Sequence, residues 1–132
     1  MLNDKNPPLR ILNVAIIGAS KDRGKYGNKS IRAHLSRGYQ VFPVHPKEDQ
    51  VEGLKAYHSV LDIPVALGRV SVYVPPAIGL GVIEEIAKKG TKELFLNPGS
   101  ESSELIEKAR GLGLEPILAC SIVDLGINPK EV

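Results

Sequence analysis

Length, composition and charge exclude several classes of protein. The chain has 132 residues, 42% of them hydrophobic and 24% charged, and a net charge of +2, which fits one globular domain with a single core. The small charge and the lack of Trp argue against nucleic-acid binding, and no apolar run approaches the roughly 20 residues of a membrane span. The single cysteine, Cys120, cannot form an internal disulfide, so we expect a cytoplasmic protein. Residues 1–10 are polar and contain two prolines, so we expect a flexible lead before a domain of residues 11–132.

The first elements predict a strand, a glycine-bearing turn and a helix. The apolar run of residues 11–17 stops at Gly18, and a basic loop leads into a helix whose predicted buried face carries Ile31 and Leu35. Gly38 follows as a helix stop. Open α/β folds build anion sites in this order, because small residues admit a phosphate and the helix start offers free N–H groups.

Strands and helices then alternate along the rest of the chain. Further strands are predicted at residues 39–44, 69–74, 93–96 and 116–119. Between the first two of these we expect only a short extended piece at 53–57 and one helical turn at 60–63. The clearest helical period comprises Ile78, Val82, Ile83 and Ile86. The connections are too long for hairpins, so we predict an α/β fold: a Rossmann-like, doubly wound, mostly parallel five-stranded sheet in three layers.

Ligands of such sheets bind outside the carboxyl ends of the strands. The predicted ends are Gly18-Ala19-Ser20, Val44-His45-Pro46, Val74-Pro75-Pro76, Asn97-Pro98-Gly99 and Cys120-Ser121. None has the paired carboxylates of acid–base hydrolysis, and the three histidines lack metal-ligand spacing. We therefore expect neither a catalytic residue nor a metal site.

The second strand end indicates the kind of nucleotide. It lacks the acidic residue that would bind an unphosphorylated ribose and offers His45 and Lys47, which suit a ribose with an extra phosphate. Lys21, Arg23 and Lys25 add positive charge near the predicted pyrophosphate. NADP and coenzyme A (CoA) both fit, and the residues alone do not choose between them.

Three stretches of the chain carry a family resemblance. They read Val-Ala-Ile-Ile-Gly-Ala-Ser at 14–20, Val-Phe-Pro-Val-His-Pro at 41–46 and Ser-Val-Tyr-Val-Pro-Pro at 71–76, with looser matches at 97–102 and around Cys120. Together they resemble the stand-alone CoA-binding domain proteins. The fold of that family also forms the N-terminal domain of the succinyl-CoA synthetase α subunit and of related ADP-forming acyl-CoA synthetases.

The resemblance implies a role for each strand end. The residues implied to hold the pyrophosphate are Gly18, Ala19 and Ser20. The residues implied to flank the adenosine are Val44, His45 and Pro46, and those implied to line the wall beside it are Val74, Pro75 and Pro76. Those towards the pantetheine are Asn97, Pro98 and Gly99, and the candidate set is completed by Lys25, Tyr26 and Cys120. The chain departs from the family at His45, where Asn is common, and at Ser121, where Pro usually follows the cysteine.

We therefore predict a protein that binds CoA or an acyl-CoA without catalysis, as a sensor, carrier or partner subunit. One alternative is an NADP-dependent reductase, for which Tyr26, Tyr73 and His45 are the candidate proton donors. Others are a detached subunit of an ADP-forming acyl-CoA synthetase, which needs a partner bringing a phosphorylated histidine, and an adaptor with a vestigial loop. A mixed disulfide between Cys120 and CoA is a further hypothesis. The sequence does not decide between a homodimer and association with a synthetase subunit.

Overall fold

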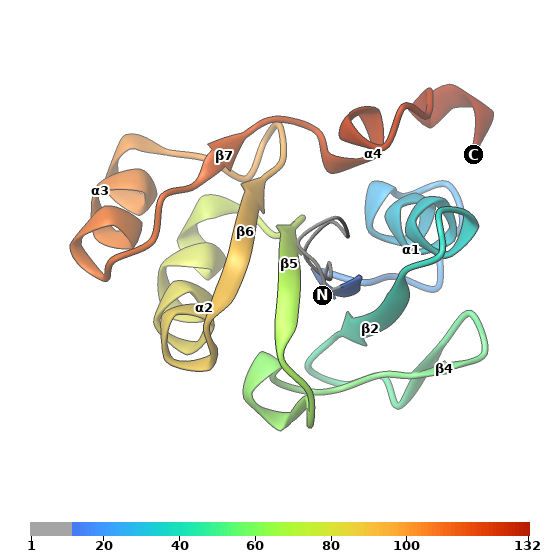
Figure 1. The fold of residues 1–132 in the computed structure, drawn as a ribbon, viewed down its shortest axis with the longest axis horizontal. Helices are drawn as coiled ribbons and strands as arrows, with labels where there is room; N and C mark the ends of the chain where they lie inside the picture. The colour runs from blue at the N-terminus through green and yellow to red at the C-terminus, as the bar shows by residue number, and fades with distance from the viewer. Residues whose placement is uncertain (1–11) are drawn as a thin grey trace, which may run out of the picture.

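The computed structural model describes residues 12–132, which form a five-stranded parallel sheet with helices on both faces (Figure 1). The strands are β1 (Asn13–Ile17), β2 (Gln40–Val44), β5 (Leu67–Val72), β6 (Thr91–Leu96) and β7 (Ile117–Leu118), in the spatial order β2-β1-β5-β6-β7. Every neighbouring pair is parallel. The chain runs outward from β1 to β2 and then crosses back to β5, so the strand order reverses between β1 and β5. The predicted fold class is confirmed, and the predicted N-terminal lead lies outside the described residues.

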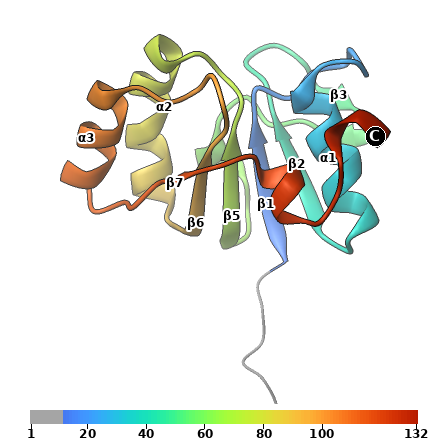
Figure 2. The same ribbon diagram turned by 90° about the horizontal axis from the view of Figure 1, so that it is seen from above.

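Helices cover the two faces of the sheet unequally (Figure 2). One face packs against α1 (Tyr26–Ser36) and the short α4 (Ser121–Asp124), and the other against α2 (Pro76–Lys89), α3 (Ser103–Gly111) and the 3-10 turn η1 (Val60–Asp62). A second 3-10 turn, η2 (Pro129–Glu131), follows α4. Neighbouring residues of β1 point to opposite faces, which explains why its predicted strand is apolar throughout. None of the helices within residues 12–132 is long and apolar enough to cross a membrane.

The buried face of α1 differs from the predicted one. Ile31 is buried, but Leu35 is 41% exposed, so its predicted place in the core is wrong. The positions that face the sheet beside Ile31 include Ser30 and His34. They are polar because β5 carries the buried Arg69 beneath this helix, and its guanidinium contacts His34.

A hairpin absent from the sequence prediction braces the loop after β1. The extended piece expected at 53–57 is the second arm of an antiparallel pair, β3 (Gln50–Val51) and β4 (Leu54–Lys55). Its two turn residues, Glu52 and Gly53, have φ values of +51° and +74°, as a tight two-residue hairpin requires. The Glu52 carboxylate accepts hydrogen bonds from Arg23 Nη1 (2.8 Å) and Asn28 Nδ2 (3.0 Å).

Candidate functional site

A cavity of about 1260 Å³ opens at the carboxyl ends of the parallel strands. Its lining comes from the segments that follow all five strands: residues 18–20, 24–27, 45–46, 73–75, 97–100, Ile78, Cys120, Val123 and Pro129. The structure thus brings together all of the predicted site residues except Val44 and Pro76. Val44 is buried in β2, and Pro76 is the first residue of α2, where the missing N–H of proline has no consequence.

The turn after β1 and the start of α1 are in very close contact. Gly18 has a φ of +89°, a left-handed conformation that favours glycine. A Cβ atom placed on Gly27 would lie 2.1 Å from the Gly18 carbonyl oxygen, so a side chain at Gly27 is incompatible with this packing. The first turn of α1 therefore rests directly on the end of β1, facing the cavity.

In the turn after β1, the backbone N–H groups of Gly18 and Ala19 are already hydrogen-bonded, so other N–H groups are available to a ligand. Gly18 and Ala19 both donate their N–H groups to the Val44 carbonyl oxygen, at 3.2 Å each. Within residues 12–132, the N–H groups of Ser20, Tyr26 and Gly27 have no acceptor. They stand at the positive end of the α1 dipole, so this turn offers an anion the N–H groups at the helix start.

Hydrogen bonds fix the shape of the loop between β1 and α1. The fully buried Asn28 donates from Nδ2 to the Ser20 carbonyl oxygen at 2.9 Å. The Ser20 hydroxyl accepts from the Asp22 N–H at 3.0 Å, and the Asp22 carboxylate accepts from the Gly24 N–H at 2.9 Å. These hydrogen bonds hold the loop in one defined shape.

The three predicted basic side chains divide into two groups. Lys21 pairs with Glu48 at 3.1 Å and Arg23 with Glu52 at 2.8 Å. Lys25 lines the cavity, and it is the single Lys, Arg, Asp or Glu side chain among the lining residues within the described part of the chain. One positive charge thus stands beside the free N–H groups of α1.

His45 closes the turn after β2. Its Nδ1 accepts hydrogen bonds from the N–H groups of Lys47 and Glu48, at 3.0 Å each. Nδ1 is therefore unprotonated and the ring proton is on Nε2. An asparagine side-chain oxygen could accept the same two N–H groups, which gives a physical reason why His45 can stand where the resembling family often has Asn.

A polar network underlies the β6 and β7 ends of the cavity. The buried Asn97 donates from Nδ2 to Ser71 Oγ (2.8 Å) and accepts at Oδ1 from the Ser121 N–H (2.9 Å). The Ser121 hydroxyl contacts Ser71 Oγ at 2.7 Å and the Tyr73 hydroxyl at 2.9 Å. Burial raises the pKa of Tyr73, so its hydroxyl stays neutral at physiological pH. The Asn97 side chain is committed to positioning the start of α4, next to Cys120.

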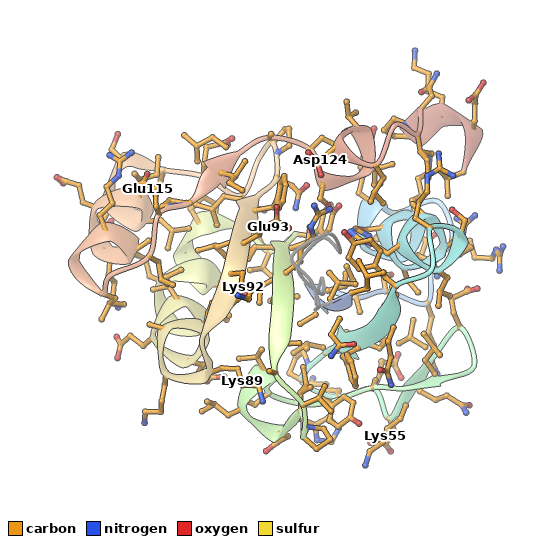
Figure 3. The ribbon with its side chains drawn as sticks, viewed as in Figure 1. Lys55, Lys89, Lys92, Glu93, Glu115 and Asp124 are labelled. Carbon is orange, nitrogen blue, oxygen red and sulfur yellow. The ribbon has the colours of Figure 1, made fainter. Side chains whose placement is uncertain are left out.

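A second, buried cluster ties α4 to the sheet. Arg69 of β5 is 3% exposed and donates to Glu93 of β6 at 3.1 Å and to Asp124 of α4 at 2.7 Å. Figure 3 labels these two carboxylates. Arg69 also contacts His34 Nε2 at 3.3 Å, and burial lowers the pKa of His34 to about 4. This cluster was not predicted from the sequence, because there Arg69 is a single polar residue at the start of a predicted strand.

Metal-binding side chains do not gather in the described residues. No group of three or more His, Cys, Asp or Glu side chains within residues 12–132 is placed to hold a metal ion. Cys120 is partly exposed and lines the cavity.

Comparison with known proteins identifies the family. A family model described as a CoA binding domain matches residues 12–126. The chain belongs to this CoA-binding domain family. Among its relatives is subunit alpha of the ADP-forming acetate–CoA ligase I of Pyrococcus furiosus, 31% identical over 136 aligned residues that cover 91% of this chain and 29% of the subunit. The chain spans between 11% and 29% of the length of seven curated relatives.

Solved structures share the fold of this CoA-binding domain. A conserved hypothetical protein from Pyrococcus furiosus superposes with a TM-score of 0.77 at 37% identity, covering 88% of this chain and 99% of that one. The dinucleotide-forming acetyl-coenzyme A synthetase 1 of Ca. Korarchaeum cryptofilum, in complex with phosphate and ADP, gives a TM-score of 0.73 at 32% identity. That match covers 83% of this chain and 26% of the synthetase.

Proposed function

We propose that the chain binds CoA or a CoA ester in the cavity at the carboxyl ends of its strands. Membership of the CoA-binding domain family supports this, as do relatives named as CoA ligases. The observation that carries the proposal is the start of α1. There, unpaired N–H groups, a helix dipole and Lys25 face the cavity, with glycine on both sides of the strand-to-helix contact.

The pyrophosphate of CoA fits this helix start. Ser20, Tyr26 and Gly27 offer the N–H donors, and Lys25 offers a charge-assisted contact. Gly18 and Ala19 would shape the turn through their bonds to Val44 and would not themselves donate to phosphate. This refines the role that the resemblance implies for the Gly-Ala-Ser turn.

The order of the strands gives the ligand a direction. His45 and Pro46, after β2, lie to one side of the α1 start, whereas Val74, Asn97 and Cys120 lie on the side of β5, β6 and β7. The ring of His45, whose Nδ1 is occupied by the two backbone N–H groups, would offer its Nε2 to the phosphorylated adenosine. The pantetheine would then run past the ends of β5 and β6 towards Cys120.

The lining favours binding over catalysis. Among the described residues that line the cavity there is one lysine and no carboxylate, so the lining has no pair of carboxyl groups for acid–base hydrolysis. Tyr73, a candidate proton donor for a reductase, is hydrogen-bonded to Ser121 and its pKa is raised by burial. We propose a sensor, carrier or binding subunit.

A second candidate function is a binding subunit of an ADP-forming acyl-CoA synthetase. It is favoured by the alignment with a synthetase subunit alpha over 91% of this chain. Such a role requires a partner that brings the phosphorylated histidine and the nucleotide site. Affinity purification of the tagged chain from its own cells tests this, because a partner of that kind would copurify.

Thermal unfolding with a series of nucleotides tests the proposed ligand. A ligand at 100 times its dissociation constant adds about 2.7 kcal/mol, which for a domain of this size raises Tm by about 10 °C. We expect this shift with CoA, a smaller one with dephospho-CoA, and none with NAD or NADP. A shift with NADP alone would favour the reductase, and no shift with any of them would favour the adaptor.

A further inference from the structure

The cavity wall carries two exposed apolar side chains that the proposed CoA contacts do not use. Ile78, in the first turn of α2, is 56% exposed, and Val123 of α4 is 58% exposed. Both line the cavity. The sequence pattern places Ile78 on the buried face of its helix, but that face is formed by Gly79, Ile83 and Ile86. Ile78 lies in the first turn of α2, soon after the end of β5, and its side chain lines the cavity.

Exposure of these two side chains within one cavity differs from scattered exposure elsewhere. Scattered exposed apolar residues are ordinary, and Leu35 and Leu61 are examples outside the cavity. Ile78 and Val123 instead come from separate elements, α2 and α4, to one cavity. Val123 is held there, because its neighbour Asp124 is bound to Arg69 at 2.7 Å and Ser121 is bound to Asn97 at 2.9 Å.

Charged side chains do not line the β5, β6 and β7 side of the cavity within the described residues. The lining residues of the β5, β6 and β7 ends within the described chain include Val74, Pro75, Asn97, Pro98 and Cys120, and none is Lys, Arg, Asp or Glu. The one lining charge, Lys25, belongs to the α1 start. A carboxylate laid against Ile78 and Val123 would displace apolar contact and would meet no lysine or arginine among the neighbouring lining residues of the described chain.

We infer that the ligand is a CoA thioester whose acyl group is apolar and longer than acetyl, and that its chain lies against Ile78 and Val123. The inference rests on the proposed function, in which the α1 start holds the phosphates and the thioester lies at the ends of β5, β6 and β7. Apolar contact there adds affinity with each buried methylene, up to about fourfold apiece. A terminal carboxylate on the acyl group reverses the gain.

Calorimetric titration with matched thioesters tests the inference. The probes are CoA, acetyl-CoA, butyryl-CoA and succinyl-CoA, the last two having acyl chains of equal carbon number that differ in a terminal carboxylate. We expect butyryl-CoA to bind at least fivefold more tightly than acetyl-CoA and at least tenfold more tightly than succinyl-CoA. Equal affinities for butyryl-CoA and acetyl-CoA, or for butyryl-CoA and succinyl-CoA, would overturn it.

Two exposed positions allow matched variants. Ile78→Ser and Val123→Ser should each reduce the ratio of butyryl-CoA to acetyl-CoA affinity towards one, whereas Leu61→Ser, an equivalent change outside the cavity, should leave the ratio unchanged. An unaltered ratio in both cavity variants would contradict the placement. If CoA binds and the acyl chain adds nothing, this inference alone fails, and if no CoA species binds, the proposed function fails with it.

Discussion

Replacing Gly27 with alanine perturbs the contact on which the proposed phosphate site depends. The new Cβ would lie 2.1 Å from the Gly18 carbonyl oxygen and 3.1 Å from its carbon, about 1 Å inside the usual van der Waals separation. The start of α1 must move away from β1 by about that distance. Overpacking of this kind costs about 1–3 kcal/mol, even though alanine is intrinsically the better helix former.

Urea and thermal unfolding of two matched variants measure this cost. Gly27→Ala should lose about 2 kcal/mol, or about 7 °C in Tm for a chain of this length, and should also weaken CoA binding by displacing the N–H groups of Tyr26 and Gly27. Gly81→Ala is the control, because a Cβ at Gly81 in α2 meets no atom within 4 Å. It should stabilise the protein by about 0.5–1 kcal/mol. A Gly27→Ala variant as stable as the unmodified chain would refute the close-contact reasoning.

Three further predictions concern polar groups around the cavity. His45→Ala removes the acceptor of two backbone N–H groups and should cost about 1–2 kcal/mol, whereas His45→Asn should retain most of the stability; equal losses in thermal unfolding would show that Nδ1 does not cap the turn. Asp124→Asn removes the charge of one of the two carboxylate partners of Arg69. It should destabilise the protein by about 1 kcal/mol and lower the affinity for butyryl-CoA, because α4 is held less firmly. An unchanged stability together with an unchanged affinity would contradict this role. The folded-state pKa of His34 is lowered from 6.5 to about 4, so on acidification the unfolded chain binds this proton before the folded chain does. His34 should therefore contribute about 3 kcal/mol to the free energy of unfolding above pH 6.5, and this contribution should be lost as the pH falls towards 4. Unfolding measured from pH 7 to pH 4 should show this slope in the unmodified chain and in a His58→Gln control but not in His34→Gln, and equal slopes in all three would contradict it.

The strands of the five-stranded sheet and the three longer helices could be predicted because each has a local signal, whereas the β3–β4 hairpin was missed. Gly38 and Gly90 both follow helices with a φ of +84°, and the Ser102 hydroxyl accepts from the Leu105 N–H at the start of α3, as the capping patterns predict. The strands of a sheet covered on both faces are short apolar runs. These signals lie within a few residues of one another, so a single sequence contains them.

The buried faces of the helices could be predicted only in part. Periodicity marks which residues are apolar, but it does not say what each side of a helix meets. On α1 it is His34, and not Leu35, that meets the guanidinium of Arg69 in the sheet, and on α2 Ile78 lines the cavity and is not buried. Arg69 lies more than 30 residues from Leu35, and the cavity that Ile78 lines is built from separate segments of the chain. The local pattern contains neither.

The candidate site was located by topology, and its details were not. The parallel order placed the strand ends at one edge, and Lys25, His45 and Cys120 line the cavity there. Their role in binding stays a prediction. The close contact of Gly27 with Gly18, and the donation of two N–H groups to Val44, depend on tertiary geometry. These contacts determine which backbone N–H groups lack an acceptor, and the spacing of residues in the sequence does not predict that.

A titration of ¹⁵N-labelled protein with CoA, followed by two-dimensional NMR, tests most directly whether the ligand binds at the α1 start. The amide signals of Ser20, Tyr26 and Gly27 should move furthest, with smaller changes at His45 and Cys120, and dephospho-CoA should reduce the change at His45. Leu61 and His58, outside the cavity, should not respond. Shifts confined to residues away from the strand ends, or no shift at millimolar CoA, would contradict the proposed site.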